Sequence, residues 1–295
     1  MSTVASSHKA VVPPVLPHKA KSRAMTKFMR NKAAVAGALV VAFFALAAIF
    51  APLLAPYDPF QTSFLTIRQP PSAEFWFGTD ELGRDIFSRM LYGARASLMA
   101  GVVSVAIAVA IGVPLGLVAG YFGSWTDMAI SRLTDALLAI PFLILAIALA
   151  AFLGPSLTNA MIAIGLSAVP IFIRITRAQT LSVKAEDYVE GARAIGLPNL
   201  WILLRYVFPN TLPPIIVQAS LTIAAAIIAE ASLSFLGLGQ QPPNPSWGSM
   251  LNTAKNFMSQ APTMSVFPGA AIFLVVLGFN LLGDGLRDAL DPREQ

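Results

Sequence analysis

Three ionisable residues inside long apolar stretches are the residues of this sequence best suited to chemistry. Asp135 and Arg174 lie at matching depths of two consecutive apolar segments, and Glu230 lies deep in a later one. A charge within a bilayer is costly and marks a functional site by default. Asp135 and Arg174 could form a structural ion pair or a contact that gates a pathway. Glu230 needs a wet cavity, a polar partner or a proton, and it is a further candidate for a pathway residue.

The sequence lacks the groups that standard catalysis and metal binding require. It has no cysteine, which excludes disulfides and thiolate chemistry, and its two histidines, His8 and His18, lie in the N-terminal tail. No lysine follows a glycine, so the phosphate-binding loop of ATPases is absent. We therefore predict a non-catalytic protein with no metal or cofactor of its own.

Composition places the chain in a membrane. Of its 295 residues, 56% are hydrophobic and only 12% are charged, with a mean hydropathy of +0.69, whereas soluble domains are about 25% charged. Five runs contain no Asp, Glu, Lys or Arg: 33–57, 96–126, 136–173, 206–229 and 256–283. A spanning helix needs about 20 apolar residues, so the run 136–173 can hold two, divided at Gly154-Pro155-Ser156. The prediction is an all-α integral membrane protein with six transmembrane helices. The runs lack the alternation of β-barrel strands.

The distribution of basic residues predicts the orientation. Seven Lys or Arg residues precede the first apolar segment, and no acidic residue occurs before Asp58. This positive-inside pattern places the N-terminus in the cytoplasm and is favoured over nucleic-acid binding. Five Lys or Arg residues also border the loop 178–205, against Lys255 alone in 239–263, which puts these two loops on opposite sides.

The chain is predicted to consist of five consecutive regions. They are a mostly disordered cytoplasmic basic tail (1–32), a first transmembrane helix (33–56), an extracytoplasmic segment (57–95), a five-helix core (96–288) and a cytoplasmic tail (289–295). The core spans are expected at 97–121, 128–153, 157–177, 207–238 and 265–286, with a cytoplasmic loop at 178–206 and an outer loop at 239–263. Within the extracytoplasmic segment, residues 85–91 place apolar side chains on one helical face, with Arg89 opposite. We expect this helix to lie in the membrane interface, with a soluble loop helix as the alternative.

The cytoplasmic loop is predicted to hold two short helices. The first starts with acidic residues, which suit a helix N-terminus, and stops at Gly196, with Pro198 just beyond. Its apolar residues share one face: Tyr188, Val189, Ala192 and Ile195. Asn199 is a suitable N-cap for the second helix, and Pro209 marks its junction with the next span. A half-apolar helix beside a membrane could pack on its own bundle or dock on a partner.

The spacing in this loop resembles the EAA loop of ABC-importer permeases. The run Glu190-Gly191-Ala192 is followed after three residues by Gly196, and after nine more by Tyr206-Val207-Phe208-Pro209. Gly191 and Tyr206 depart from the usual pattern. Four further segments look like the C-type permease subunit of dipeptide, oligopeptide and nickel importers: 77–85, 230–239, 241–248 and 283–288. The resemblance extends from about residue 26 to the end.

The resemblance implies a type I ABC importer permease fold with cytoplasmic coupling helices. The implied ATPase-coupling residues are Tyr188, Val189, Glu190, Gly191, Ala192, Ile195 and Gly196. The implied partners are a second, homologous permease subunit, two ATP-binding subunits that carry ATP and Mg, an extracytoplasmic substrate-binding protein and membrane lipids. The chain would then lie in a bacterial inner membrane with both termini cytoplasmic and act by alternating access. The resemblance favours a structural position for Glu230.

Two other classes of transport protein are weaker alternatives. A stand-alone ion- or proton-coupled transporter would be expected to show an inverted repeat with broken, charge-bearing helices, and none is evident. A channel would need a filter-like sequence, and none is evident either. Peptides or similarly sized solutes are the expected cargo. The sequence leaves open a dipeptide, an oligopeptide, glutathione, a nickel chelate or an opine.

Overall fold

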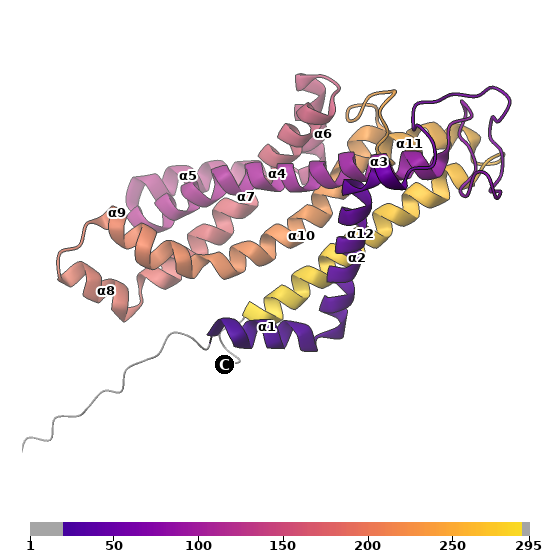
Figure 1. Cartoon of the computed structure of the whole chain (residues 1–295). Helices are drawn as coiled ribbons and strands as arrows, with labels where there is room; N and C mark the ends of the chain where they lie inside the picture. Colours follow the sequence, from indigo (N-terminus) through magenta and orange to yellow (C-terminus); the bar gives the residue numbers. More distant parts are fainter. Residues whose placement is uncertain (1–19, 291–295) are drawn as a thin grey trace, which may run out of the picture.

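Apolar helices form nearly all of the structure, a computed structural model that describes residues 20–290, with side chains from residue 25 onward (Figure 1). The α-helices are α1 Ala20–Arg30, α2 Lys32–Ile49, α3 Ala51–Leu54, α4 Ile86–Phe122, α5 Ser124–Leu138, α6 Phe142–Leu153, α7 Leu157–Lys184, α8 Asp187–Ala194, α9 Asn199–Ile202, α10 Phe208–Phe235, α11 Trp247–Ala254 and α12 Thr263–Leu290. A π-helical turn, η1 (Leu203–Val207), joins α9 to α10, and a 3-10 turn, η2 (Lys255–Phe257), follows α11. The described residues contain no β-strand, and the predicted all-α class is confirmed.

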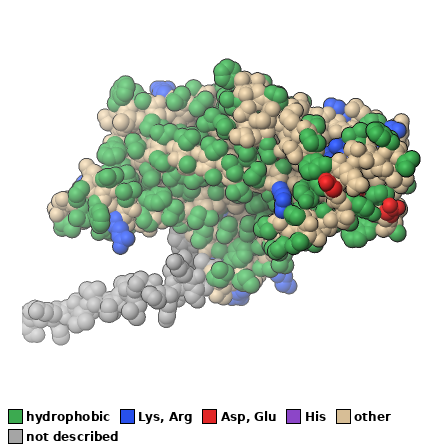
Figure 2. Space-filling model, turned by 45° about the horizontal axis from the view of Figure 1, so that its top comes forward, with side chains coloured by type: hydrophobic (Ala, Val, Ile, Leu, Met, Phe, Trp, Pro, Cys, Tyr) green, Lys and Arg blue, Asp and Glu red, His purple; other side chains and the backbone are tan. Residues whose placement is uncertain are grey.

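Six segments are long and apolar enough to cross a membrane if one bent pair is counted as a single span. Five are α2, α4, α7, the continuous run Asn199–Phe235 and α12, and the sixth is α5 with α6. Figure 2 shows a face covered largely by hydrophobic side chains, with charged groups few and scattered. A surface of this kind suits contact with lipid rather than water.

The predicted third span is broken near its middle. α5 ends at Leu138, α6 begins at Phe142, and the two helices are bent by 91°. Pro141 lies at the break with extended backbone angles and has no N–H to continue the helical hydrogen bonds. Proline alone does not cause the break, because α4 and α7 continue through Pro114 and Pro170. We attribute the bend to packing, since α5 contacts both α4 and α7 whereas α6 contacts α7.

The helix expected in the membrane interface is instead the start of the second span. α4 begins at Ile86, capped by the Asp85 carboxylate, and runs without a break to Phe122. Ile86 is fully buried and Arg89 is only 6% exposed, so neither face of this turn is free to lie on a bilayer. The prediction of an interfacial helix is wrong because the segment 57–85 covers it and supplies a carboxylate to Arg89.

Three further boundaries differ from the prediction. Residues 20–30 of the expected disordered tail form α1, whereas residues 1–19 and 291–295 of the two tails lie outside the described residues. The second loop helix is not separate from the fifth span, because α9, η1 and α10 are continuous. The outer loop contains α11, which is held by a capping box between Ser246 and Ser249.

Small residues on α4 set its close contact with α7. A Cβ atom at Gly116 would stand 2.7 Å from the carbonyl oxygen of Ile173, and one at Gly120 would stand 2.7 Å from the Cβ of Thr180. Glycine at four-residue spacing allows backbones to approach where lipid offers no hydrophobic drive. α4 and α7 form the most extensive helix pair of the structure. α5 and α10 each pack against both helices of this pair.

The two ends of the long helices carry different short elements. α8 lies at one end, between α7 and α9, and α11 lies at the other end beside the segment that precedes α4 (Figure 1). α6 points away from the rest of the bundle in the same view. The candidate site residues are therefore distributed along the whole length of the bundle.

Candidate functional site

α8 presents one edge of its apolar stripe to its own bundle and leaves the other edge exposed. Val189 is fully buried and Ala192 is 5% exposed, whereas Tyr188 is 44% and Ile195 is 77% exposed. The bundle therefore covers Val189 and Ala192, and the coupling role of the four residues stays a prediction. The four positions spread over about 120° around the helix axis, and the bundle covers only part of that arc. Burial, and then the charge of Glu186, raise the pKa of Tyr188.

Gly196 ends α8 as the sequence predicts. Its φ is +80°, in the left-handed region that residues with a Cβ rarely adopt. Its N–H donates to the carbonyl of Arg193 at 3.0 Å, and the N–H of Leu197 donates to that of Ala192 at 3.3 Å. These two bonds form a Schellman motif, which turns the chain sharply after the helix. The turn directs the chain from α8 into α9.

Tyr121 ties the α8 region to the end of α4. Its side chain is buried, and its hydroxyl donates to the Asn199 carboxamide oxygen at 3.0 Å. The Lys184 ammonium donates to the Tyr121 carbonyl at 2.5 Å and lies 5.6 Å from the ring centroid. The Arg193 guanidinium of α8 lies 5.9 Å from the same centroid. Asn199 is therefore not the predicted N-cap, a position that Pro198 takes, but a link to α4. Four helices meet at this one tyrosine.

Two ion pairs join α5 to α7. Arg174 Nη2 lies 2.9 Å from Asp135 Oδ1, so the predicted contact is present. Arg177 makes a bidentate pair with Asp127, with Nη2 at 2.7 Å from Oδ2. Sequence reasoning missed this second pair, although Asp127 precedes Asp135 by two helical turns and Arg177 follows Arg174 by about one. The side chains of Asp135 and Arg174 are 62% and 63% exposed, so this pair lies on the surface of the chain.

Glu230 lies inside the chain. Glu230 is fully buried, and its carboxyl accepts hydrogen bonds from the Ser97 hydroxyl at 2.9 Å and from the Ser234 hydroxyl at 2.7 Å. The backbone N–H of Trp247 donates to the same Ser97 hydroxyl at 3.4 Å. Of the alternatives that the sequence left open, the structure shows a carboxyl with polar partners. The group links α4, α10 and α11 and does not reach a surface of this chain.

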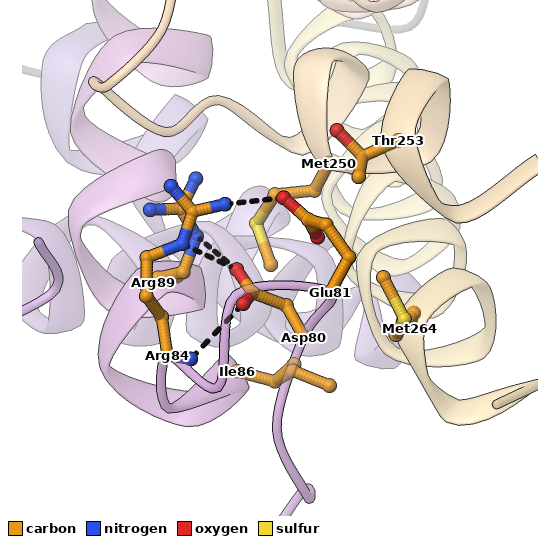
Figure 3. A pocket seen from close by; sticks show the side chains of 8 residues that line it. All are labelled: Asp80, Glu81, Arg84, Ile86, Arg89, Met250, Thr253 and Met264. Carbon is orange, nitrogen blue, oxygen red and sulfur yellow. Dashed lines mark hydrogen bonds and ion pairs between the residues drawn. The ribbon is translucent and has the colours of Figure 1, made fainter. Parts of the chain in front are cut away.

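A buried charge cluster lies at the end of the bundle that carries α11. Asp80 Oδ2 lies 2.7 Å from Arg84 Nε and 3.3 Å from Arg89 Nε, and Arg84 Nη2 lies 2.6 Å from Glu81 Oε1 (Figure 3). Asp80, Arg84 and Arg89 are each less than 9% exposed. Arg89 also donates to the carbonyl of Pro59 at 2.9 Å. The cluster ties the segment 57–85 to α4, and we refer to these four charged residues as the outer clasp, after the side of the membrane that the sequence predicts for this segment.

The outer clasp encloses little space. Its cavity, which Met250 and Met264 also line, has a volume of about 10 Å³, room for at most about one water. Burial, and then the charge of Asp80, raise the pKa of Glu81. The cluster therefore serves to hold elements together rather than to admit a solute. Within residues 20–290, no group of three or more His, Asp or Glu side chains is placed to hold a metal ion.

Comparisons with known proteins agree with this geometry. Residues 112–295 match the family model described as the inner membrane component of binding-protein-dependent transport systems. Residues 22–71 match the N-terminal transmembrane domain of oligopeptide transport permease C. The dipeptide transport system permease protein DppC of Alkalihalophilus pseudofirmus is 50% identical, over 92% of this chain and 89% of that protein. The glutathione transport system permease protein GsiD of Escherichia coli O6:K15:H31 is 50% identical, over 90% of this chain and 88% of that protein.

A solved structure shares the fold. An inward-facing MetNI methionine ABC transporter aligns with a TM-score of 0.59 at 19% identity, over 70% of this chain and 98% of the matched chain. The likeness at this level of identity concerns the fold alone. It supports the predicted type I permease architecture.

Proposed function

The chain belongs to the family of inner membrane components of binding-protein-dependent transport systems, as a permease subunit of an ATP-driven importer. From this premise we propose that it forms half of a solute pathway, whose conformational change is driven through α8. The observation that carries the proposal is the exposed edge of α8, fixed by the Gly196 turn at one end of the bundle. The proposed docking residues are Tyr188, Gly191 and Ile195 on this edge and Glu190 on the exposed side of the helix beyond it. Val189 and Ala192 anchor the helix to the bundle.

The proposed partner of α8 is an ATP-binding subunit. Two large apolar side chains, Tyr188 and Ile195, remain exposed on a helix that should lie outside the membrane, and such groups favour a protein partner. Two such subunits, with their ATP and Mg, would supply the energy, since this chain lacks the phosphate-binding loop. A movement of α8 would reach α4 through Tyr121 and Asn199. The bundle would thereby alternate between inward and outward access.

The family and the distribution of basic residues support our proposals for the remaining partners and the orientation. We propose a heterodimer with a second, homologous permease and an extracytoplasmic binding protein that delivers the solute. The relatives named for dipeptide and glutathione transport support a peptide or a solute of similar size. Seven Lys or Arg residues before the first span support cytoplasmic termini in the bacterial inner membrane. Cysteines placed at Asp187 and Asn244 should then react with an impermeant thiol reagent from opposite sides, and labelling from one side would refute this orientation.

We propose that Asp135 and Arg174 act at the pathway or its gate. The pair is exposed on the isolated chain, on the surface where α5 and α7 lie together. In water an exposed pair contributes about 0.2–1 kcal/mol, whereas a pair taken out of water contributes more because a lone charge there is costly. Glu230, with all its contacts inside the chain, has a supporting role instead.

Asp135→Ala alone should reduce transport by more than the double change Asp135→Ala/Arg174→Ala, because the single change leaves the guanidinium without its carboxylate. A double-mutant cycle on initial uptake rates should give a coupling energy of about 1 kcal/mol or more. Arg132→Ala is the control, since Arg132 is exposed on α5 and has no ion pair in the described chain. Strictly additive losses would show that the pair does not act together.

Affinity purification tests the proposed assembly. A tag on this chain should recover the second permease and the ATP-binding subunits from membranes in fixed proportions. Recovery should fall when Ile195 or Tyr188 is replaced by Asp, because a charge would then face the apolar partner surface. A stand-alone transporter, the alternative from another class, would purify without an ATP-binding subunit and still catalyse uptake.

A further inference from the structure

A groove between α2 and α4 lies on the apolar surface of the chain. Its volume is about 470 Å³, within the range of small-molecule sites. Ala45 and Ile49 of α2 line one side, and Leu98, Met99 and Val102 of α4 line the other. Every one of these side chains is apolar. We refer to this feature as the α2–α4 groove.

Arg95 is the one charged residue that lines the α2–α4 groove. Its Nε donates to the carbonyl of Ala48 at 2.5 Å and its Nη2 donates to that of Ile49 at 2.9 Å, which caps the end of α2. A guanidinium has five N–H donors, so these two bonds leave most of them free. Arg95 is exposed and has no carboxylate partner within residues 20–290. Its guanidinium also lies 5.4 Å from the centroid of the Tyr92 ring, so this ring and the carbonyls at the end of α2 offset part of the charge, but no carboxylate of the described residues neutralises it.

The groove is charged at one end and apolar at the other, as one membrane leaflet is. Arg95 lies where α2 ends and the chain leaves for the extracytoplasmic segment, which is the outer boundary in the proposed orientation. From Arg95 to Val102 the groove follows α4 inward for about 10 Å, at 1.5 Å a residue. The hydrocarbon core of one leaflet is about 15 Å deep, half of the full core. The charged end thus meets the headgroup level and the apolar end reaches towards the bilayer centre.

We propose that the α2–α4 groove binds a phospholipid of the outer leaflet, with its phosphate on Arg95 and one acyl chain between α2 and α4. Charge complementarity favours the phosphate, because arginine binds phosphate through paired, charge-assisted hydrogen bonds. The phosphate would supply the full negative charge that no carboxylate of the described residues gives to Arg95. It would also hold α2 against α4 where α2 ends at Ile49, just before α3 begins at Ala51.

Native mass spectrometry of the purified importer, titrated with dioleoyl phosphatidylglycerol, tests the site. The wild-type complex should retain one lipid that Arg95→Gln binds at least about tenfold more weakly, as expected for the loss of a charge-assisted contact. Val102→Trp should lose the same lipid by filling the groove while leaving Arg95 intact. It also keeps the test decisive if Arg95→Gln fails to assemble.

Two matched variants control for non-specific effects. Arg132→Gln removes an exposed charge from α5, and Ile111→Trp adds the same indole to an exposed position of α4 outside the groove. Both should retain the lipid as the wild type does. Equal retention by Arg95→Gln and Arg132→Gln would overturn the proposal. So would a cross-link from Val102→Cys to the second permease, since protein would then fill the groove.

Discussion

Gly196→Val should weaken binding of the ATP-binding subunit by at least about tenfold while leaving the bundle folded. The residue has a φ of +80°, and a side chain in this region costs about 1–2 kcal/mol, more for a β-branched one. A Cβ at Gly196 would meet no atom within 4 Å, so the effect comes from the backbone alone. The strain shifts the turn after α8 away from the docking conformation. Affinity for the purified ATP-binding subunit and the thermal midpoint of the permease measure the two parts separately.

Two glycine variants make this prediction specific. Gly196→Asn should retain most of the affinity, because asparagine tolerates the left-handed region. Gly191→Ala should leave the thermal midpoint unchanged or slightly raised, since Gly191 lies inside α8 with open space around it. Transport and affinity at wild-type level in Gly196→Val would contradict the role assigned to this turn.

Asp80→Asn should destabilise the outer end of the bundle by about 3–5 kcal/mol, the cost of removing one member of a buried ion pair. The carboxylate of Asp80 faces both Arg84 and Arg89, and the amide would leave these two buried cations with Glu81 alone. The extracytoplasmic segment would then detach from α4. The measurement is the thermal midpoint of the purified complex, together with protease sensitivity of residues 57–85.

Asp58→Asn is the control for the outer clasp. Asp58 is an exposed carboxylate of the same segment, and its one side-chain contact in the described chain is a bond from the N–H of Phe60. The change removes the same charge without uncovering a buried cation. A thermal midpoint for Asp80→Asn as high as that for Asp58→Asn would show that the clasp does not hold this end.

Most of the helical plan could be predicted because long charge-free runs have one stable conformation in lipid. α7 begins where predicted and runs on to Lys184, and α12 extends its predicted span by a few residues at each end. The bend at Pro141 could not be predicted, since Pro114 and Pro170 occupy continuous helices. A proline permits a break, but tertiary packing decides whether it occurs. The sequence of α4 likewise does not say that its first turns are covered.

The candidate site shows the same division between local and long-range features. The Gly196 turn could be predicted because it depends on a few adjacent residues. The Asp135–Arg174 contact followed from the equal depth of two antiparallel helices. The outer clasp was missed, although its charges are unusual in a charge-poor chain, because Arg89 meets Asp80 only when a loop folds back on α4.

Uptake by reconstituted liposomes tests the central claim most directly. Liposomes would contain this chain with its co-purified second permease and ATP-binding subunits. The loaded binding protein would be supplied on the side of the membrane opposite α8. The account predicts uptake only when ATP reaches the side of α8 and all four components are present. It also predicts that the Gly196→Val complex takes up far less solute. Vectorial uptake by this chain alone, driven by an ion gradient and indifferent to ATP, would contradict the account.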